Sequence, residues 1–477
     1  MSEELWRWSA TETAEAIRVG AVSAVEVVTA ALARLEKTNP VSNAFGEIAE
    51  DALDRAKEAD AAITRGDAVG PLHGVPTAIK LNTEVEGLPT PDGVAEYRKY
   101  PAAETAPVVR NLAAAGAISI GRTNCPPFST MWSTHSEPFG ITRNPWDPAV
   151  TPGGSSGGAA VALATGVVSI AHGNDLGGSI RYPAAVCGVV GLRPTYGRVP
   201  IWHAAPGRGM PLCVQQFAVE GPLGRTVADV RLGLRAMEGA DPRDPMAVPL
   251  PPAHPSEGPI RIAIVVDPGE QPLAGPGSSE TTDAVRTAGS WLAEVGYEVE
   301  EVALPALGAA ATLWWQLALT DFKVGGMVGE VHRVGDSTIR AWYDHMYSVY
   351  DDVFGEVTLA DFADGYARRS LIRRQVSEFM DRYQVLLLPA SGGPAYALDG
   401  ELESTSRVAE LLRQQWPNTA IPVLGLPGLG LPVISTQGAP LGVQLAGRAF
   451  DEETLLRVGE VLEGRANIAI PIDPKPL

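Results

Sequence analysis

The hydrophobic pattern of the N-terminal part predicts amphipathic helices that begin at capping boxes. Ser9 is followed three residues later by Glu12, and Ser23 is followed in the same way by Glu26. In such a box, the two side chains satisfy backbone N–H groups that the first helical turn leaves without a partner. The chain is therefore expected to open with two helices.

Further along, helical periodicity alternates with short apolar runs that have the length of strands. The first two helices are expected to end near residues 20 and 39–40, and further helices are predicted over 49–65, 105–115, 159–164 and 281–294. Strands are predicted over 72–81, which Pro76 interrupts, and over 117–120, 261–266, 297–302, 385–388 and 441–445. This alternation is typical of an α/β fold with a mixed sheet.

Residues 313–383 are helical in pattern and rich in aromatic side chains. We expect most of these side chains in the core, with the alternative that some of them line an apolar substrate pocket. They are Trp314, Trp315, Phe322, Trp342, Tyr343, Tyr347, Tyr350 and Phe354.

The most unusual stretch is 151–194, where an apolar helix and strand separate two glycine-flanked serine clusters. The first cluster, Gly153–Gly158, opens a helix, so its backbone N–H groups favour a developing negative charge. A helix and a returning strand can bring the second cluster, Gly177–Ser179, beside it. The glycines allow positive φ and a close approach of substrate to the main chain. An oxyanion hole fits this pattern better than a Gly/Ser linker, because linkers do not usually lie inside so apolar a segment.

Composition and charge narrow the class of partner. Hydrophobic residues make up 45% of the 477 residues and charged residues 19%, which is ordinary for a globular protein. A formal net charge of −19 opposes binding to nucleic acid or to anionic membranes. The three cysteines are too few for a disulfide framework, and we see neither a secretory leader nor an apolar run of membrane-spanning length. We therefore expect a cytoplasmic protein that binds a small molecule.

Several familiar chemistries do not fit the pattern. The seven histidines show no useful grouping and no metal-ligand spacing, so metal catalysis is not expected. A phosphate-binding loop would need Lys and then Ser or Thr where Ala159-Ala160 follow the first cluster. Residues 153–157 match the G-x-S-x-G nucleophile elbow, but an elbow follows a strand, and residues 144–152 contain three prolines.

A series of motifs runs in one order along almost the whole chain. They are Gly74-Val75-Pro76 with Lys80, Gly121-Arg122-Thr123-Asn124, Phe139-Gly140, Arg143-Asn144-Pro145-Trp146, Pro152 to Gly158, Asp175 with Gly177 to Arg181, Pro183-Ala184, Cys187-Gly188, Gly191 to Thr195, Gly221-Pro222, Arg225-Thr226-Val227 with Asp229, Gly425-Leu426-Pro427, Leu441 to Leu445 and Asp451-Glu452. With these motifs, the chain resembles the amidase signature family of serine hydrolases.

The resemblance implies the α/β amidase signature fold, in which helices cover both faces of a central mixed β-sheet. We expect a single domain over residues 1–477. Its parts would be the N-terminal helices (1–65), the catalytic core (70–230), the helical, aromatic-rich substrate-pocket region (305–385) and the return of the core (420–465).

The resemblance also implies a Ser-Ser-Lys triad. It assigns Ser179 as the nucleophile, Ser155 as the bridging serine, a position usually found with a cis peptide bond, and Lys80 as the base. The chemistry of these residues agrees, because a serine hydroxyl needs a base to take its proton and lysine is a base only when neutral. The apolar neighbours at 78, 79 and 81 would desolvate the ammonium and lower the pKa of Lys80.

The remaining site residues follow from the same resemblance. The oxyanion hole is expected on the backbone N–H groups of Leu176, Gly177, Gly178 and Ser179. Substrate is expected to contact Ser129, Thr130, Met131, Trp132 and Gly154. Ser156, Asp175 and Arg181 are expected to hold the catalytic loop, although a purely structural ion pair is the alternative for Asp175 with Arg181.

Two departures from the family pattern point to a reshaped acyl pocket: Leu81 where an acid is common, and Met131-Trp132 where a Gly or Ser pair is common. We expect an amidase with no cofactor and no metal, which acts on a small-molecule amide or carbamate. Anilides, esters and urethanes are within reach of the same chemistry. The alternatives are the catalytic subunit of a glutamine-dependent amidotransferase and a non-catalytic anion-binding protein. No nucleic-acid or membrane partner is expected, and a homodimer is left open.

Overall fold

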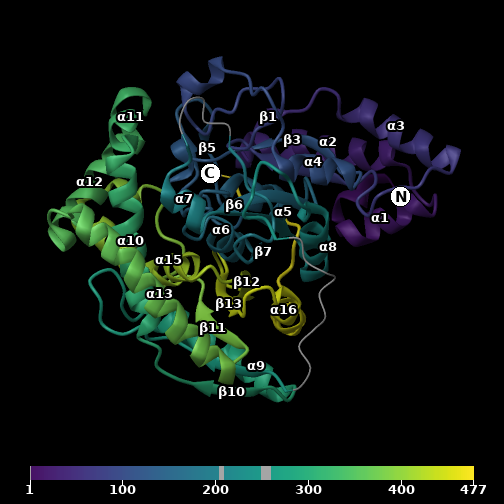
Figure 1. Cartoon of the computed structure of the whole chain (residues 1–477). Coiled ribbons are helices and arrows are strands. Elements are labelled where there is room, and N and C mark those ends of the chain that lie inside the picture. Colours follow the sequence, from purple (N-terminus) through teal and green to yellow (C-terminus); the bar gives the residue numbers. More distant parts are fainter. Residues whose placement is uncertain (1, 204–208, 249–258, 477) are drawn as a thin grey trace.

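The computed structural model describes residues 2–203, 209–248 and 259–476, and its strands form one large sheet and one small one (Figure 1). The strands are β1 (Phe45–Ile48), β2 (Pro76–Lys80), β3 (Ile118–Thr123), β4 (His135–Ser136), β5 (Gly140–Ile141), β6 (Ile170–Asp175), β7 (Val190–Arg193), β8 (Val219–Gly224), β9 (Arg261–Ile264), β10 (Glu298–Glu301), β11 (Val385–Pro389), β12 (Gly428–Ile434) and β13 (Leu441–Gly447). The large sheet has eleven strands in the order β1-β3-β2-β6-β8-β7-β12-β13-β11-β9-β10, and β4 pairs with β5.

The large sheet is mixed, as the sequence predicts. Strand β2 runs parallel to β3 and β6, and β9 runs parallel to β10 and β11. The other neighbours are antiparallel. The parallel pairing of β2 with β6 matters for function, because it brings the carboxyl ends of the two strands to the same edge.

The helices are α1 (Ala10–Arg18), α2 (Ala24–Ser42), α3 (Ala52–Arg65), α4 (Pro107–Ala114), α5 (Gly157–Ala164), α6 (Arg181–Cys187), α7 (Leu212–Phe217), α8 (Val227–Met237), α9 (Ser279–Glu294), α10 (Ala306–Val324), α11 (Met327–Val334), α12 (Ser337–Phe354), α13 (Leu359–Arg382), α14 (Thr405–Gln414), α15 (Trp416–Leu424) and α16 (Glu452–Ala466). Short 3-10 helices cover Ser2–Arg7, Ala95–Lys99, Pro127–Ser129 and Gly400–Leu402. Figure 1 shows α10 to α13, in green, gathered on the opposite side of the molecule from the purple N-terminal helices.

Helices cover both faces of the large sheet, and β11 shows why. Its side chains alternate, so Leu386 and Leu388 join the core cluster that contains α2, α5, α6, α10, α12 and α15. Val385 and Leu387 join the second cluster, with α4, α8, α9 and α16. The predicted fold class is therefore confirmed. Within the residues that the structure describes, no helix is both long enough and apolar enough to cross a membrane.

The local predictions hold for helix starts better than for ends. Both capping boxes form, at Ser9 and at Ser23. Helix α2, however, continues through Pro40 to Ser42, because a proline in the last turn removes only one N–H and the left-handed Asn43 then ends the helix. The predicted strand over 72–81 begins only at Pro76, a first-strand position that needs no donor.

Candidate active site

The three predicted catalytic side chains come from neighbouring strand and helix ends. Lys80 is the last residue of β2, and Ser179 lies between the end of β6 and the start of α6. Ser155 lies in the turn just before α5. Because β2 and β6 are adjacent and parallel, this topology brings residues that are distant in sequence to one edge of the sheet.

Lys80 is fully buried and contacts two neutral groups. Its Nζ lies 2.7 Å from Ser155 Oγ and 2.7 Å from Asn174 Oδ1. Burial disfavours the ammonium and lowers the pKa of Lys80. The geometry therefore joins Lys80 to Ser155 directly and gives the lysine the environment of a base.

Ionisable groups around Lys80 oppose the effect of burial on its pKa. The fields of Cys125, Asp92, Glu220 and Asp175 act to raise it. Burial raises the pKa of Asp92 itself to about 6, although Ser129 Oγ donates to Asp92 Oδ1 over 2.6 Å. The protonation of the lysine thus depends on its neighbours as well as on its burial.

The two serine clusters lie side by side, as the sequence pattern predicts. The Ser156 N–H donates to the Ser179 carbonyl over 3.2 Å. The peptide bond between Gly154 and Ser155 is cis. Of the six glycines expected to allow positive φ, only Gly153 and Gly178 use it, at 77° and 100°. The others serve close packing: a Cβ at Gly154 would lie 2.5 Å from the carbonyl oxygens of residues 131 and 133.

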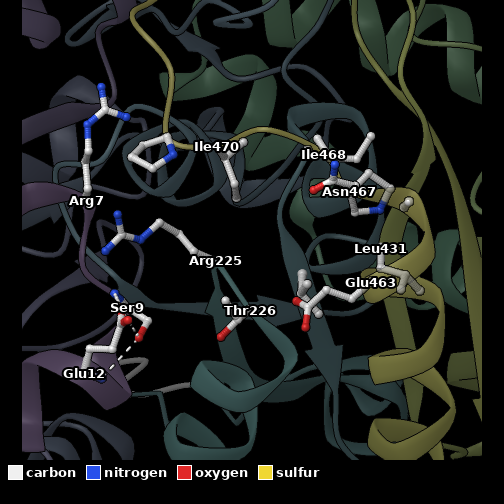
Figure 2. Close-up of a pocket in the computed structure, with 15 residues that line it drawn as sticks. Arg7, Ser9, Glu12, Arg225, Thr226, Leu431, Glu463, Asn467, Ile468 and Ile470 are labelled. Carbon is white, nitrogen blue, oxygen red and sulfur yellow. Dashed lines mark hydrogen bonds between the residues drawn. The ribbon is translucent and has the colours of Figure 1, made fainter.

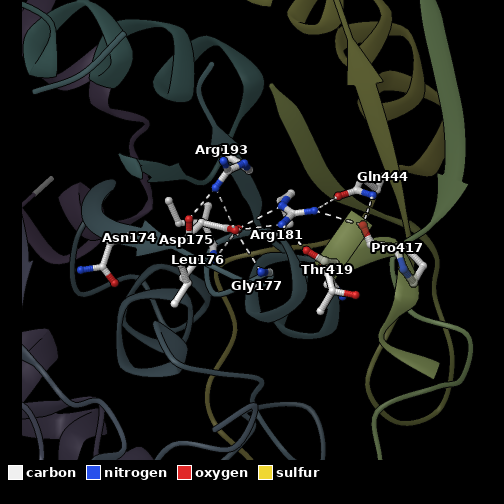
Figure 3. Close-up of polar contacts among 12 residues, drawn as sticks. Asn174, Asp175, Leu176, Gly177, Arg181, Arg193, Pro417, Thr419 and Gln444 are labelled. Atoms are coloured by element: carbon white, nitrogen blue, oxygen red, sulfur yellow. Dashed lines mark hydrogen bonds and ion pairs between the residues drawn. The ribbon is translucent and has the colours of Figure 1, made fainter. Parts of the chain in front are cut away.

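Asp175 anchors the loop that carries Ser179 (Figure 3). It accepts hydrogen bonds from Arg181 at 2.8 and 3.0 Å, from the Gly178 N–H at 2.9 Å and from the Ile180 N–H at 3.2 Å. Arg193, which sequence reasoning missed, donates to the Asp175 carbonyl and lies 3.4 Å from its carboxylate. Burial opposes ionisation, but the charge and hydrogen bonds of Arg181 hold the pKa of Asp175 well below its usual range.

This anchoring changes the expected oxyanion hole. The Gly178 N–H is already donated to Asp175, so it is not free for an oxyanion. The N–H groups of Leu176, Gly177 and Ser179 make no hydrogen bond within the described part of the chain. These three are the donors that remain.

Ser179 opens onto a pocket with an aromatic wall. The pocket is lined by Ser129, Thr130, Met131, Trp132, Leu176, Gly177, Ser179, Trp314, Trp315, Leu319, Phe322, Trp342, Tyr343 and Met346. Four of the five residues expected to contact substrate are among them, and Gly154 is not, because it packs against the main chain of 131–133. The aromatic side chains from α10 and α12 that line the pocket are thus distinguished from Tyr347, Tyr350 and Phe354, which do not.

The tryptophans of the wall are fixed by main-chain acceptors. Trp132 Nε1 donates to the Gly177 carbonyl and Trp314 Nε1 to the Leu176 carbonyl, both over 2.9 Å. Trp315 packs edge-to-face on both, with ring centroids 5.7 Å from Trp132 and 4.7 Å from Trp314. The indole rings are therefore held next to the catalytic loop by the same backbone that forms it.

Two buried acids that support the site gave no sequence signal. Glu401 accepts the Trp132 N–H at 2.7 Å and the Ser133 N–H at 3.1 Å, and burial raises its pKa. Glu220 lies 2.6 Å from His172 Nε2 and 3.7 Å from His203 Nε2. The histidines are thus grouped in space, contrary to the expectation, although in the described residues no set of three potential ligands could hold a metal ion.

A larger cavity, of about 280 Å³, lies elsewhere (Figure 2). Arg7, Arg225 and the Ser9–Glu12 pair lie on one side of it, and Glu463 and Asn467 lie on the other. None of Lys80, Ser155 and Ser179 reaches it, so it is not the site of this chemistry.

Comparison with known proteins agrees with this geometry. Residues 26–456 match the family model described as Amidase. The indoleacetamide hydrolase of Bradyrhizobium diazoefficiens is 38% identical over 470 residues, which cover 97% of this chain and 87% of the relative. A glutamyl-tRNA(Gln) amidotransferase subunit of Chloroflexus aurantiacus is 33% identical, with coverage of 96% and 97%. The structure of 6-aminohexanoate cyclic dimer hydrolase complexed with substrate has a TM-score of 0.80 at 27% identity and covers 98% of both chains. The chain therefore belongs to the amidase signature family, and it is an amidase, a hydrolase of carbon–nitrogen bonds in amides.

Proposed function

We propose that this amidase cleaves small arylacetamides through an acyl-enzyme on Ser179, with Ser155 and Lys80 as its proton path. The observation that carries the proposal is the 2.7 Å contact between the buried Lys80 Nζ and Ser155 Oγ, beside a serine that opens onto an aromatic pocket. Nucleophile, proton path and substrate wall thus lie together.

In the first step, Ser179 Oγ attacks the amide carbonyl carbon. Its proton passes to Ser155 Oγ, whose own proton passes to the free amine of Lys80. The carbonyl oxygen becomes an oxyanion, which the N–H groups of Leu176, Gly177 and Ser179 are free to stabilise. Each such donor typically lowers a barrier by about 3 kcal/mol.

In the second step, the proton held by Lys80 returns through Ser155 to the leaving nitrogen, the C–N bond breaks and ammonia departs. Water then attacks the acyl-enzyme by the same proton path and releases the carboxylic acid. The lysine returns to the free amine, so the cycle consumes one water and needs no other reactant.

The aromatic wall supports the substrate class. Trp132, Trp314, Trp315 and Trp342 line the pocket that contains Ser179, and offset or edge-on ring contacts contribute about 0.5–1.5 kcal/mol beyond the buried area. The relative that is 38% identical is an indoleacetamide hydrolase, whose name denotes an arylacetamide substrate. Both observations favour an aromatic acyl group over a short aliphatic one.

A second candidate is the transamidation subunit, favoured by the 33% identity to a glutamyl-tRNA(Gln) amidotransferase subunit. The net charge of −19 gives no support for direct contact with tRNA. A homodimer and a cytoplasmic location stay expectations from the sequence, to be checked by light scattering and cell fractionation.

The experiment measures kcat/KM of the purified chain alone for indole-3-acetamide, phenylacetamide, hexanamide and acetamide. We expect the two arylacetamides to be preferred over acetamide by at least tenfold. A fluorophosphonate probe with peptide mass mapping should label Ser179, and Ser179→Ala should abolish both labelling and turnover. Labelling of Ser155 or Ser156 in its place would contradict the assignment, and turnover only with added partner subunits would favour the second candidate.

A further inference from the structure

The second contact of Lys80 is an asparagine that itself is held in place. Asn174, the residue before the last of β6, accepts from Lys80 Nζ through Oδ1 at 2.7 Å. Its Nδ2 donates to Asn82 Oδ1 over 3.0 Å, and Thr83 Oγ1 donates to the same oxygen over 3.2 Å. The amide of Asn174 is buried and therefore oriented from both of its ends.

This orientation decides which way the lysine amine points. A free amine has two N–H groups and one lone pair, and an amide oxygen can only accept. When one N–H is donated to Asn174 Oδ1, the lone pair can face Ser155 Oγ, which lies at the same distance of 2.7 Å. In that arrangement, Ser155 can deliver its proton without rotation of the lysine.

The charge of Asn174 matters as much as its direction. The ionisable groups whose fields reach Lys80 are Asp92, Cys125, Asp175 and Glu220, and Glu220 also faces His172 and His203. His172 Nδ1 lies 3.5 Å from the backbone N of Lys80. Within the described ranges, no carboxylate forms an ion pair with Lys80 Nζ, so its two direct side-chain contacts are a hydroxyl and an amide.

We propose that Asn174, held by Asn82, is a positioning residue for the catalytic base: it directs the amine of Lys80 toward Ser155 and fills this contact without adding a negative charge. The inference rests on the proposed role of Lys80 and names what keeps that lysine ready to accept a proton. A carboxylate in the same place would favour the ammonium, because an opposite charge in direct contact with a buried amine stabilises its charged form.

The test compares the pH dependence of kcat/KM for phenylacetamide in the wild type, Asn174→Asp and Asn174→Ala. In Asn174→Asp, the ascending limb should move by at least one pH unit to higher pH, so activity at pH 7 falls tenfold or more and recovers in alkaline buffer. In Asn174→Ala, the plateau should fall while the limb moves much less, because no charge is added. A merely structural role would lower both plateaus and leave both limbs in place, which would overturn the proposal.

Asn82→Asp is the matched control, because it adds the same charge one side chain further from Lys80. Its limb should move less than that of Asn174→Asp, and an equal shift would show that the direct contact is unimportant. Unfolding in urea, followed by circular dichroism, confirms that each variant is folded at the assay pH. Lys80→Ala separates the two levels: if it keeps wild-type activity, the proposed function fails, whereas an inactive Lys80→Ala with an unmoved limb in Asn174→Asp overturns only the inference.

Discussion

At the scale of single residues, Lys80 is a buried cation site that has no counter-ion in direct contact among the described residues. Catalysis needs its free amine, so activity should rise with pH through the lowered pKa of Lys80. We expect Lys80→Ala to lose about a thousandfold or more in kcat/KM and to lose this ascending limb, while the chain stays folded. The measurement is the pH–rate profile on one anilide or arylacetamide substrate.

His172 provides the comparison for that prediction. It is buried and paired with Glu220, and it is the histidine nearest to Ser179 in sequence. His172→Gln, which keeps a donor for Glu220, should lose less than tenfold. An inactive His172→Gln beside an active Lys80→Ala would instead indicate a histidine-based triad.

Asp92 offers a prediction about stability and pH. Burial raises its pKa from an ordinary 3.8 to about 6, so the folded state holds this proton more tightly than the unfolded chain does. The folded state therefore loses stability as pH rises from about 4 to 6, by about 3 kcal/mol at most. Asn tolerates the positive φ of 44° at this position and lacks the titration.

In urea unfolding, Asp92→Asn should thus gain free energy of unfolding relative to the wild type between pH 4 and pH 7. A difference between the two proteins that stays constant across this range would show that Asp92 titrates normally.

At the scale of elements, Arg181 links several of them through one side chain. It pairs with Asp175 at the end of β6, donates to Gln444 on β13 and reaches the carbonyls of Pro417 and Asn418 on α15. Removing one member of a buried ion pair leaves the other uncompensated, which costs about 3–5 kcal/mol. Arg181→Gln should therefore lower the urea midpoint and slow the labelling of Ser179 by a fluorophosphonate.

Arg286→Gln is the control for that variant, because Arg286 and Glu301 form an exposed pair. Its urea midpoint should stay at the wild-type value. If the two variants have the same midpoint, the Asp175–Arg181 pair does not hold the elements together.

The same scale shows what the sequence could predict. Helices with strong local signals, such as the capping boxes at Ser9 and Ser23, formed as expected. Strand β1 (Phe45–Ile48) was missed because its few residues have no clear alternation, and β8 (Val219–Gly224) because it contains two glycines and a proline. These strands form through pairing with neighbours rather than through local preference.

The candidate site divides in the same way. Lys80, Ser155 and Ser179 stand in motifs with recognisable glycines, so the sequence could single them out. Asn174 and Glu401 have no such signal. Asn174 contacts a residue 94 positions away and Glu401 residues more than 260 positions away, and only the folded chain brings them together.

At the scale of the whole molecule, the substrate wall combines segments that are far apart in sequence. Trp315, from α10, has no hydrogen-bond partner for Nε1 among the described residues, so Trp315→Phe removes ring area and no hydrogen bond. We expect the ratio of kcat/KM for phenylacetamide to that for acetamide to fall about two- to tenfold, which corresponds to the roughly 0.5–1.5 kcal/mol of an aromatic contact. Steady-state rates on both substrates provide the measurement.

Trp291→Phe, on α9 and on the opposite face of the sheet, is the matched control and should leave the ratio unchanged. Equal ratios in wild type and Trp315→Phe would place the acyl-binding wall away from α10.

Helices α10 to α13 enter the chain as one uninterrupted insert between β10 and β11, whereas Lys80, Ser155 and Ser179 all precede it. The part of the gene that encodes residues 306–382 can therefore diverge, or be exchanged with that of a relative, without touching a codon of the reaction centre. The face of α10 that packs on α15 is the constraint on such an exchange, since α15 also receives the hydrogen bonds of Arg181. A library confined to this insert, with the α15-facing positions kept, would explore new amide substrates while the bond-breaking machinery stays the same.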